Sequence, residues 1–380
     1  MIDLELSSEQ ILIKETAKDF AEKHLLPGVI ERDEKEQFPK DEIKKMGELG
    51  FMGMMVPEKW GGSGLDSISY TIAIEEIAAI ELATSTIMSV NNSMVCSVLS
   101  DWASNFQKEK YLKPLAKGKK LGAYSLSEPQ SGSDARNMKT VAEKDGKNYI
   151  VNGTKSWVTN GQSSDVVIFF CLTNKEKNSK DISVFIAEKG TPGLHVGKKE
   201  DKLGIRASDT CELFFENCKI PAENRIGKEG EGFSIAMKAL VGGRIGIGAQ
   251  SVGLARSALE KSVSYSKDRK QFGKPISSFG AIQNKIADMA TNIEASRLLV
   301  WQAAYLKDQG KDCIKASSMA KLFSSSTAMK AASDCVQIHG GYGYMQEYGI
   351  ERLMRDAKVT EIYEGTSEIQ RLVISRDLFK

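Results

Sequence analysis

The chain has 380 residues and carries 52 lysine and arginine residues against 50 aspartate and glutamate residues, a formal net charge of +2. Because the two signs balance and no long run of one sign occurs, the composition argues against a nucleic-acid or membrane-surface partner. No apolar run approaches the ~20 residues of a membrane span, and the acidic N-terminus resembles neither a signal nor a transit sequence. We expect a soluble protein of two or three domains, located in a bacterial cytoplasm or, for a processed eukaryotic chain, in the mitochondrial matrix.

The six cysteines and three histidines are spread along the sequence without a C-x-x-C pair. This spacing predicts no metal site and no disulfide framework. Isolated cysteines are typical of a reducing compartment, where they serve as small apolar core residues.

The first third of the chain predicts helices. Ser7 and Gln10 form a capping-box pattern, and the apolar periodicity that follows is expected to end at Pro27. Further helices are expected at residues 41–49, 67–100 and 107–116. Residues 1–121 are therefore predicted to form an all-helical domain.

The middle of the chain has short β-branched and aromatic runs separated by turn pairs. Asp145-Gly146 and Asn152-Gly153 are strong hairpin signals. A parallel sheet would need helical crossovers, and none fit between the runs. Residues 122–229 are therefore predicted to form an antiparallel, β-barrel-like domain.

Helical texture returns after Gly232 and continues to the end of the chain. Ile282, Ile286, Met289 and Ile293 keep one apolar face, and residues 316–332 are rich in alanine and serine, as in closely packed helices. Residues 230–380 are predicted to form a four-helix bundle. The fold class expected is mainly α with a central β domain, α+β.

The segment around Glu364 combines a carboxylate with a helix start. Ser367 followed by Gln370 has the spacing of a capping box, so the first N–H groups of a helix would point toward Thr366 and Gly365 and could hold a phosphate. Glu364 is therefore our candidate catalytic base beside an anion site. The alternative is an ordinary helix cap.

Two segments of the β domain could hold a cofactor, although the G-x-G-x-x-G and G-x-x-x-x-G-K-[S/T] fingerprints are absent. Residues 124–134 are dense in hydroxyls, glycine and carboxylates, or alternatively form a plain polar loop. Trp157 and Thr159 lie two residues apart on one strand face, where an indole beside a donor suits a flat heteroaromatic ring. A core tryptophan is the alternative.

Two segments of the last third could bind the rest of a dinucleotide. Arg269 and Phe272 could clamp a pyrophosphate and cover an adenine, or they form a solvated helix end. Gln337 precedes a Gly-Gly pair that ends at Gly341, which allows close backbone approach but is equally a helix stop.

Taken together and in this order, these segments resemble the acyl-CoA dehydrogenase family over essentially the whole chain. Residues 242–247 and 362–372 are most similar to its short-chain, butyryl-CoA branch. The resemblance implies FAD-dependent dehydrogenation of a short-chain, or alternatively medium-chain, acyl-CoA to trans-2-enoyl-CoA in fatty acid β-oxidation. It also implies electron transfer to electron-transferring flavoprotein and a homotetramer. A flavin oxidase or monooxygenase that uses oxygen, or a non-catalytic flavin-bearing protein, remains an alternative.

The resemblance also assigns roles to individual residues. Glu364 matches the family base, and its own backbone N–H would stabilise charge on the thioester oxygen together with an FAD hydroxyl. Burial is expected to raise the pKa of Glu364. Gly243 stands where some relatives place their base, and glycine cannot act as one. The acyl-pocket floor is expected around residues 87–99.

The remaining matched positions are expected to bind FAD or acyl-CoA. FAD would be held between the β domain and the bundle by residues of the same subunit: Tyr124, Leu126, Ser127, Gly132, Ser133, Trp157, Thr159, Thr366 and Glu368. A neighbouring subunit would supply Arg269, Phe272, Gln337 and Gly341. Acyl-CoA would be held by Ser133, Gly243, Arg244, Gly365 and Arg376. Gly280 stands where many relatives have a glutamine at the adenine, so it is left out of the set.

Overall fold

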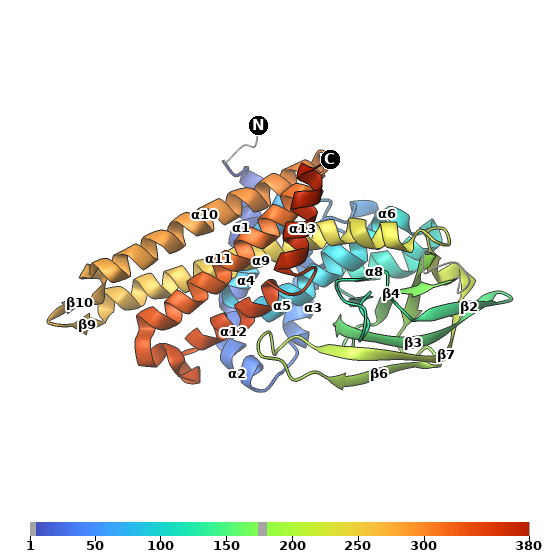
Figure 1. Cartoon of the computed structure of the whole chain (residues 1–380), viewed down its shortest axis with the longest axis horizontal. Helices are drawn as coiled ribbons and strands as arrows, with labels where there is room; N and C mark the ends of the chain where they lie inside the picture. The colour runs from blue at the N-terminus through green and yellow to red at the C-terminus, as the bar shows by residue number, and fades with distance from the viewer. Residues whose placement is uncertain (1–4, 174–180, 380) are drawn as a thin grey trace.

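The computed structural model describes residues 5–173 and 181–379, and Figure 1 shows N-terminal helices, a sheet and a group of long C-terminal helices. The first helix, α1 (Ser8–Phe20), begins at the predicted capping box, in which Ser7 Oγ accepts from the Gln10 N–H at 3.2 Å. Pro27 does not end the helical path, because it lies in the first turn of a short 3-10 helix, where a missing N–H is tolerated. The other N-terminal elements are η1 (Ala21–Leu25), η2 (Leu26–Gly28), α2 (Val29–Glu34), α3 (Lys40–Glu48), η3 (Phe51–Gly53), η4 (Glu58–Trp60), α4 (Ser67–Ile80), α5 (Leu82–Ser89), η5 (Val90–Cys96), α6 (Ser97–Trp102), α7 (Asn105–Gln107), η6 (Lys108–Leu112) and α8 (Lys113–Ala116).

The middle of the chain forms a mixed sheet in the order β6-β7-β3-β2-β4-β5-β8, with β1 paired to β4. Its strands are β1 (Gly122–Ser125), β2 (Val141–Asp145), β3 (Asn148–Thr159), β4 (Val166–Leu172), β5 (Ile182–Glu188), β6 (Leu194–Lys199), β7 (Thr210–Pro221) and β8 (Arg225–Ile226), with η7 (Ala222–Asn224) before the last. Antiparallel pairing predominates as expected, but β1·β4 and β2·β4 are parallel. No helical crossover is needed for β2·β4, because β3 carries the chain back between them.

The sheet folds over an aromatic cluster. Phe169 of β4 lies 4.5 Å from Phe215 of β7, and Tyr149 of β3 lies 4.8 Å from Phe185 of β5, measured between ring centroids. Alternate residues of β4, such as Ile168, pack instead with N-terminal helices and the start of α9. The strand is therefore buried on both faces, which explains its unbroken apolar sequence.

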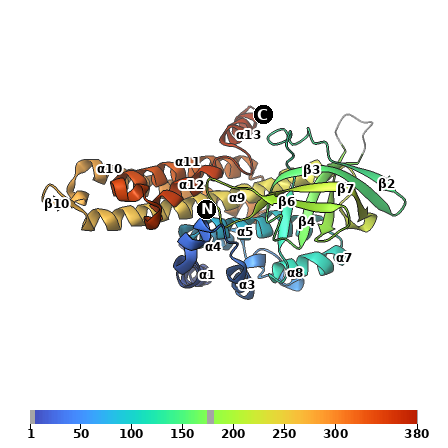
Figure 2. The same ribbon diagram turned by 90° about the horizontal axis from the view of Figure 1, so that it is seen from below.

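Three long helices and two shorter ones form the C-terminal part. They are α9 (Gly232–Asp268), α10 (Gly280–Asp308), α11 (Ile314–His339), α12 (Ile350–Thr360) and α13 (Ser367–Leu378), with connecting elements β9 (Lys270–Gln271), β10 (Lys274–Pro275), η8 (Ile276–Ser278), η9 (Gly340–Tyr344) and η10 (Gln346–Tyr348). The β9–β10 hairpin lies at the end of the molecule opposite the sheet (Figure 1). The N-terminal helices pack below both the bundle and the sheet (Figure 2). The predicted helical, β, helical fold is confirmed.

All six cysteines are free and buried. In residues 5–173 and 181–379, no helix is long and apolar enough to cross a membrane. The same residues hold no group of three or more histidine, cysteine, aspartate or glutamate side chains placed to bind a metal ion.

Candidate active site

Glu364 lies on a strained turn between α12 and α13. Its φ is 52° and that of Gly365 is 97°, so both lie in the left-handed region. A non-glycine residue there costs about 1–3 kcal/mol and needs support from its surroundings. The Gly365 carbonyl accepts hydrogen bonds from Lys321 Nζ and Gln370 Nε2, each at 2.8 Å.

The N-cap of helix α13 lies one residue earlier than predicted. Thr366 is the N-cap, and its side chain accepts from the Ile369 N–H at 3.4 Å. The predicted Ser367–Gln370 capping box is therefore wrong, because Ser367 already belongs to the helix. The Gln370 amide instead turns back to the carbonyls of Glu364 and Gly365, so it braces the turn.

Tyr363 anchors the other side of this turn. Its hydroxyl donates to Gln250 Oε1 of α9 at 2.9 Å, and Gln250 Nε2 donates to Ser85 Oγ of α5 at 3.0 Å. The turn is thereby tied to the N-terminal domain through a chain of buried side chains.

The Glu364 carboxylate occupies the space that a side chain at position 243 would fill. A Cβ built on Gly243 would lie 1.8 Å from Glu364 Oε2 and 2.8 Å from Met94 Sδ. Glu364 Oε2 is buried and has no hydrogen-bond partner among the described residues. A buried carboxylate oxygen without a partner is rare and indicates a functional group.

Burial and two cations act in opposite directions on Glu364. Burial raises the pKa of Glu364 to about 7, while the charges of Lys321 and Arg244 pull it down. Burial also lowers the pKa of Lys321 to about 8, against the attraction of Glu364. A carboxyl group with a pKa near 7 can exchange a proton at neutral pH, as a general base requires.

The end of β1 lies beside this carboxylate, and hydrogen bonds from β3 hold the loop that follows β1. The Tyr124 hydroxyl is buried without a partner among the described residues, and its pKa is raised by burial and by Glu364. Buried Lys155 donates to the Leu126 carbonyl at 3.1 Å and to Glu128 Oε1 at 2.9 Å. Ser127 is fixed through its carbonyl, which accepts from the Ser156 N–H at 3.0 Å.

The outer part of this region presents open surface. Gly132 and Ser133 are exposed, and nothing lies within 4 Å of a Cβ built on Gly132. Trp157 has a φ of 61° at a bulge in β3, and it is 66% exposed rather than a core residue. Thr159, two residues on, is half-buried. The bulge interrupts regular strand alternation and turns the indole outward.

A second group of predicted residues lies far from the first. Phe272 is 93% exposed on the β9–β10 hairpin, and the Arg269 guanidinium lies 5.5 Å from the Tyr342 ring centre, beside Gly341 in the sequence. Gln337 is exposed near the end of α11. Within one chain, the hairpin lies at the end of the bundle opposite the sheet (Figure 1).

Three further predicted residues belong to α13 and its start. Thr366 caps the helix, Glu368 is exposed in its first turn, and Arg376 is exposed near its end. Arg244 is buried on α9, where it donates to Ser318 Oγ at 3.2 Å.

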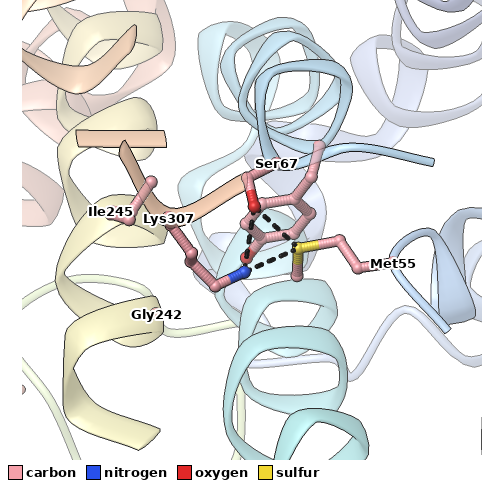
Figure 3. A pocket seen from close by; sticks show the side chains of 6 residues that line it. Met55, Ser67, Gly242, Ile245 and Lys307 are labelled. Carbon is pink, nitrogen blue, oxygen red and sulfur yellow. Dashed lines mark hydrogen bonds between the residues drawn. The ribbon is translucent and has the colours of Figure 1, made fainter. Parts of the chain in front are cut away.

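A small cavity, almost filled by the side chains that line it, lies beside Gly242 (Figure 3). It is lined by Met55, Ser67, Tyr70, Gly242, Ile245 and Lys307. The Lys307 ammonium donates to Ser67 Oγ at 2.9 Å and to Met55 Sδ at 3.5 Å.

Sequence reasoning missed Lys321, Gln250 and Lys307. The sequence pattern around Lys321 could have identified it. Its spacing from Ser317, Ser324 and Ala328 is that of residues on one face of a helix, and all four residues are buried in α11. A lysine on such a face is unusual and indicates a functional or paired charge.

Comparison with known protein families identifies the family to which this chain belongs. Models of the acyl-CoA dehydrogenase family match the chain in three parts: the N-terminal domain at residues 7–119, the middle domain at 123–218 and the C-terminal domain at 230–379. The chain belongs to the acyl-CoA dehydrogenase family. It is therefore an enzyme of an oxidoreductase family.

Individual relatives of this acyl-CoA dehydrogenase cover the whole chain. It is 47% identical over 379 residues to the short-chain specific acyl-CoA dehydrogenase of Clostridium acetobutylicum, with 100% of each chain covered. Butyryl-CoA dehydrogenase from Megasphaera elsdenii has the same fold, with a TM-score of 0.98, 45% identity and 100% of each chain covered. A structure described as the electron transferring flavoprotein of Acidaminococcus fermentans contains a chain with a TM-score of 0.98, 48% identity and the same full coverage. PigA, solved with FAD and proline, matches with a TM-score of 0.96 and 32% identity over 100% of this chain and 99% of its own.

Proposed function

We propose that the protein is an FAD-dependent dehydrogenase of short-chain acyl-CoA in which Glu364 removes the α proton of the thioester. The observation that carries this proposal is the Glu364 carboxylate itself. It is buried, lacks a partner at Oε2 among the described residues and has a pKa raised to about 7. It also fills the space left by Gly243, so α9 supplies no competing base.

The residues at the end of β1, in the loop after it and at the bulge of β3 have the chemistry to hold a flavin. The outward indole of Trp157 offers a flat surface, Gly132 leaves room for close backbone approach, and the Tyr124 hydroxyl lacks a partner in the described part of the chain. We expect these groups, with Leu126, Ser127, Ser133 and Thr159, to hold the ring side of FAD. When bound, FAD supplies the acceptor for the hydride from the β carbon.

The chain itself supplies proton removal and charge stabilisation. Glu364 takes the α proton, and burial favours this step because it raises the proton affinity of the carboxylate. We expect the backbone N–H of Glu364 to donate to the thioester oxygen as negative charge develops there. Gly365, Arg244, Ser133 and Arg376 are the proposed contacts of the acyl-CoA.

The proposed partners follow from the relatives and from the position of the hairpin. One structural relative is described as an electron transferring flavoprotein, which supports a protein of that kind as electron acceptor. Arg269 and Phe272 lie at the end opposite the sheet, which supports FAD binding by residues of a second subunit within a homotetramer.

The experiment is to mix the purified holoenzyme with butyryl-CoA without oxygen and to follow bleaching of the flavin absorbance. Glu364→Gln is expected to retain FAD but to slow bleaching by at least about 10²-fold, since a positioned general base contributes that much or more. Glu361→Gln is the matched control. That carboxylate lies on the same turn but pairs with Lys358 at 2.8 Å, so bleaching should persist.

Two results would contradict the proposal. Substantial bleaching by Glu364→Gln would remove Glu364 from the role of base. Rapid oxygen uptake by the substrate-reduced enzyme would identify an oxidase instead of a dehydrogenase that passes electrons to a protein.

A further inference from the structure

The cavity in Figure 3 adjoins the base through two neighbours. Gly242 lines the cavity, and the next residue of α9, Gly243, contacts the Glu364 carboxylate. Tyr70 also lines the cavity, and the charge of Glu364 contributes to raising the pKa of Tyr70, after burial as the main cause. The cavity and the reacting carboxylate are thus linked through Tyr70 and through the adjacent residues Gly242 and Gly243 of α9.

The cavity also borders the helices where the acyl-pocket floor was expected. Ser93 of η5 lies against Gly242, where a Cβ would come within 3.4 Å of the Ser93 carbonyl oxygen. The Tyr70 hydroxyl donates to Ser89 Oγ at 3.0 Å, which joins α4 to the same segment. An acyl tail that extends from Glu364 between α9 and this segment would run toward the cavity.

Lys307 closes the far side of this space. Its side chain projects from α10, and its Cε would lie 3.9 Å from a Cβ on Gly242. The ammonium is held by Ser67 Oγ and Met55 Sδ (Figure 3). Ser67 is itself fixed, because its N–H donates to both carboxylate oxygens of Asp308 at 3.0 Å.

Such a closure is unfavourable for a longer alkyl tail. The tail would have to displace the lysine stem and place methylene groups against an ammonium that would then lose its hydrogen bonds. Burying a charged group without partners is costly. Burial already lowers the pKa of Lys307, because the ammonium is largely removed from water and depends on its protein partners.

We propose that Lys307, held by Ser67 and Met55, closes the acyl pocket and sets the upper limit on acyl-chain length. This inference rests on the proposed acyl-CoA dehydrogenase function and adds a specificity-determining residue to it. The chemistry recognised is a short, unsubstituted alkyl tail that ends before Lys307.

The test compares kcat/KM for butyryl-, hexanoyl-, octanoyl- and dodecanoyl-CoA across variants of the holoenzyme. Lys307→Ala removes the stem and is expected to raise the octanoyl-to-butyryl ratio by about tenfold or more, the scale on which pockets discriminate methylene groups. Lys307→Met keeps the stem volume and removes the charge, so its ratio should rise less than that of Lys307→Ala. Lys311→Ala alters an exposed lysine just beyond α10 and should leave the ratio as in the wild type.

Gly242→Ala provides an opposite test that does not alter Lys307. Its methyl group would enter the cavity 3.4 Å from the Ser93 oxygen, so it should lower the hexanoyl-to-butyryl ratio. This variant keeps the inference testable if Lys307→Ala fails to fold.

The outcomes separate the two proposals. If the wild type oxidises butyryl-CoA and folded Lys307→Ala, or folded Lys307→Met where Lys307→Ala does not fold, keeps its length profile, the role of Lys307 is overturned and the proposed function stands. If Gly242→Ala keeps the wild-type hexanoyl-to-butyryl ratio, the acyl tail does not reach the cavity and the role of Lys307 is overturned in the same way. If the wild type oxidises no acyl-CoA of the series, the proposed function and this inference both fail.

Discussion

At the scale of single residues, the working pKa of Glu364 is a balance that several elements set together. Burial raises it, whereas Lys321 of α11 and Arg244 of α9 lower it. Tyr70 and Tyr124 also face the carboxylate, and burial raises the pKa of each phenol, so both stay neutral. Lys321 is bound to the turn that carries the base, because its Nζ donates a hydrogen bond to the Gly365 carbonyl.

Lys321→Met is therefore expected to raise the pKa of Glu364 further. The base must be ionised to accept a proton, so the acid limb of the kcat/KM–pH profile should move to higher pH. At pH values below the pKa of Glu364, each unit by which that pKa rises lowers kcat/KM about tenfold. Stopped-flow bleaching with butyryl-CoA between acid and alkaline pH measures the limb.

Lys321→Arg keeps the charge and should restore the limb to near its original position. If Lys321→Met lowers the rate equally at every pH, the lysine supports the turn mechanically and does not tune the base.

At the scale of elements, one buried ion pair organises the loop between β1 and β2. Lys155 of β3 and Glu128 of the loop lie 2.9 Å apart, with side chains 0% and 1% exposed. Glu128 also accepts from the backbone N–H groups of Lys139 and Thr140. Burial opposes its charge, but Lys155 and these donors hold the pKa of Glu128 below its usual range, so Glu128 is ionised at neutral pH. Burial lowers the pKa of Lys155, and the charge of Glu128 opposes that shift.

Lys155→Met should leave Glu128 buried without its cation. Removing one partner of a buried pair costs about 3–5 kcal/mol. Because the same lysine holds the Leu126 carbonyl, we expect weaker retention of FAD as well as a lower free energy of unfolding. Flavin content after gel filtration and denaturant unfolding measure the two effects.

The double variant Lys155→Met/Glu128→Gln removes the stranded charge and should recover part of the stability. It should not recover FAD retention if Lys155 positions the loop. Normal flavin content in Lys155→Met would contradict that positioning role.

At the scale of the whole molecule, the predicted cofactor residues fall into two distant groups. Trp157 belongs to the sheet, whereas Arg269 and Phe272 belong to the hairpin at the opposite end (Figure 1). The Phe272 side chain is 93% exposed, so it is free to contact another chain. In the proposed homotetramer, a second copy of the chain contacts this hairpin.

Coexpression of two defective chains tests this arrangement. One chain carries Glu364→Gln and the other carries Arg269→Ala/Phe272→Ala, and each alone should have low activity. If each site combines Glu364 of one subunit with the hairpin of another, mixed oligomers contain some sites with both defects and some with none, so activity should return. Activity no higher than the sum of the two separate chains would indicate sites built within a single subunit.

The sequence predicted elements and residue types well where local patterns decide them. The Ser7 capping box, the hairpin at Gly146 and the apolar face of α10 all follow from short-range spacing. The hairpin expected at Asn152-Gly153 is wrong, because both residues lie inside β3, where the pairing with β7 shifts its register instead of turning. Thr366 was missed as the N-cap because two adjacent hydroxyl residues both satisfy the local pattern. Only the extended backbone of Thr366 identifies the true cap.

Features that depend on packing between distant segments could not be predicted. The fit of Glu364 into the space at Gly243 joins residues more than one hundred positions apart, and no local pattern encodes that distance. The Lys307–Ser67 contact and the parallel β1·β4 pair depend in the same way on how the three regions come together.

Because every cysteine is buried, the native protein should react only slowly with thiol reagents. The thiolate is the reactive form, and burial raises the pKa of all six thiols. Modification by an alkylating agent therefore reports opening of the structure, and the cysteines report on all three regions of the chain at once. A single cysteine introduced on the exposed surface would be the one site to take a fluorescent label, so motion or subunit exchange can be followed without first removing the native thiols.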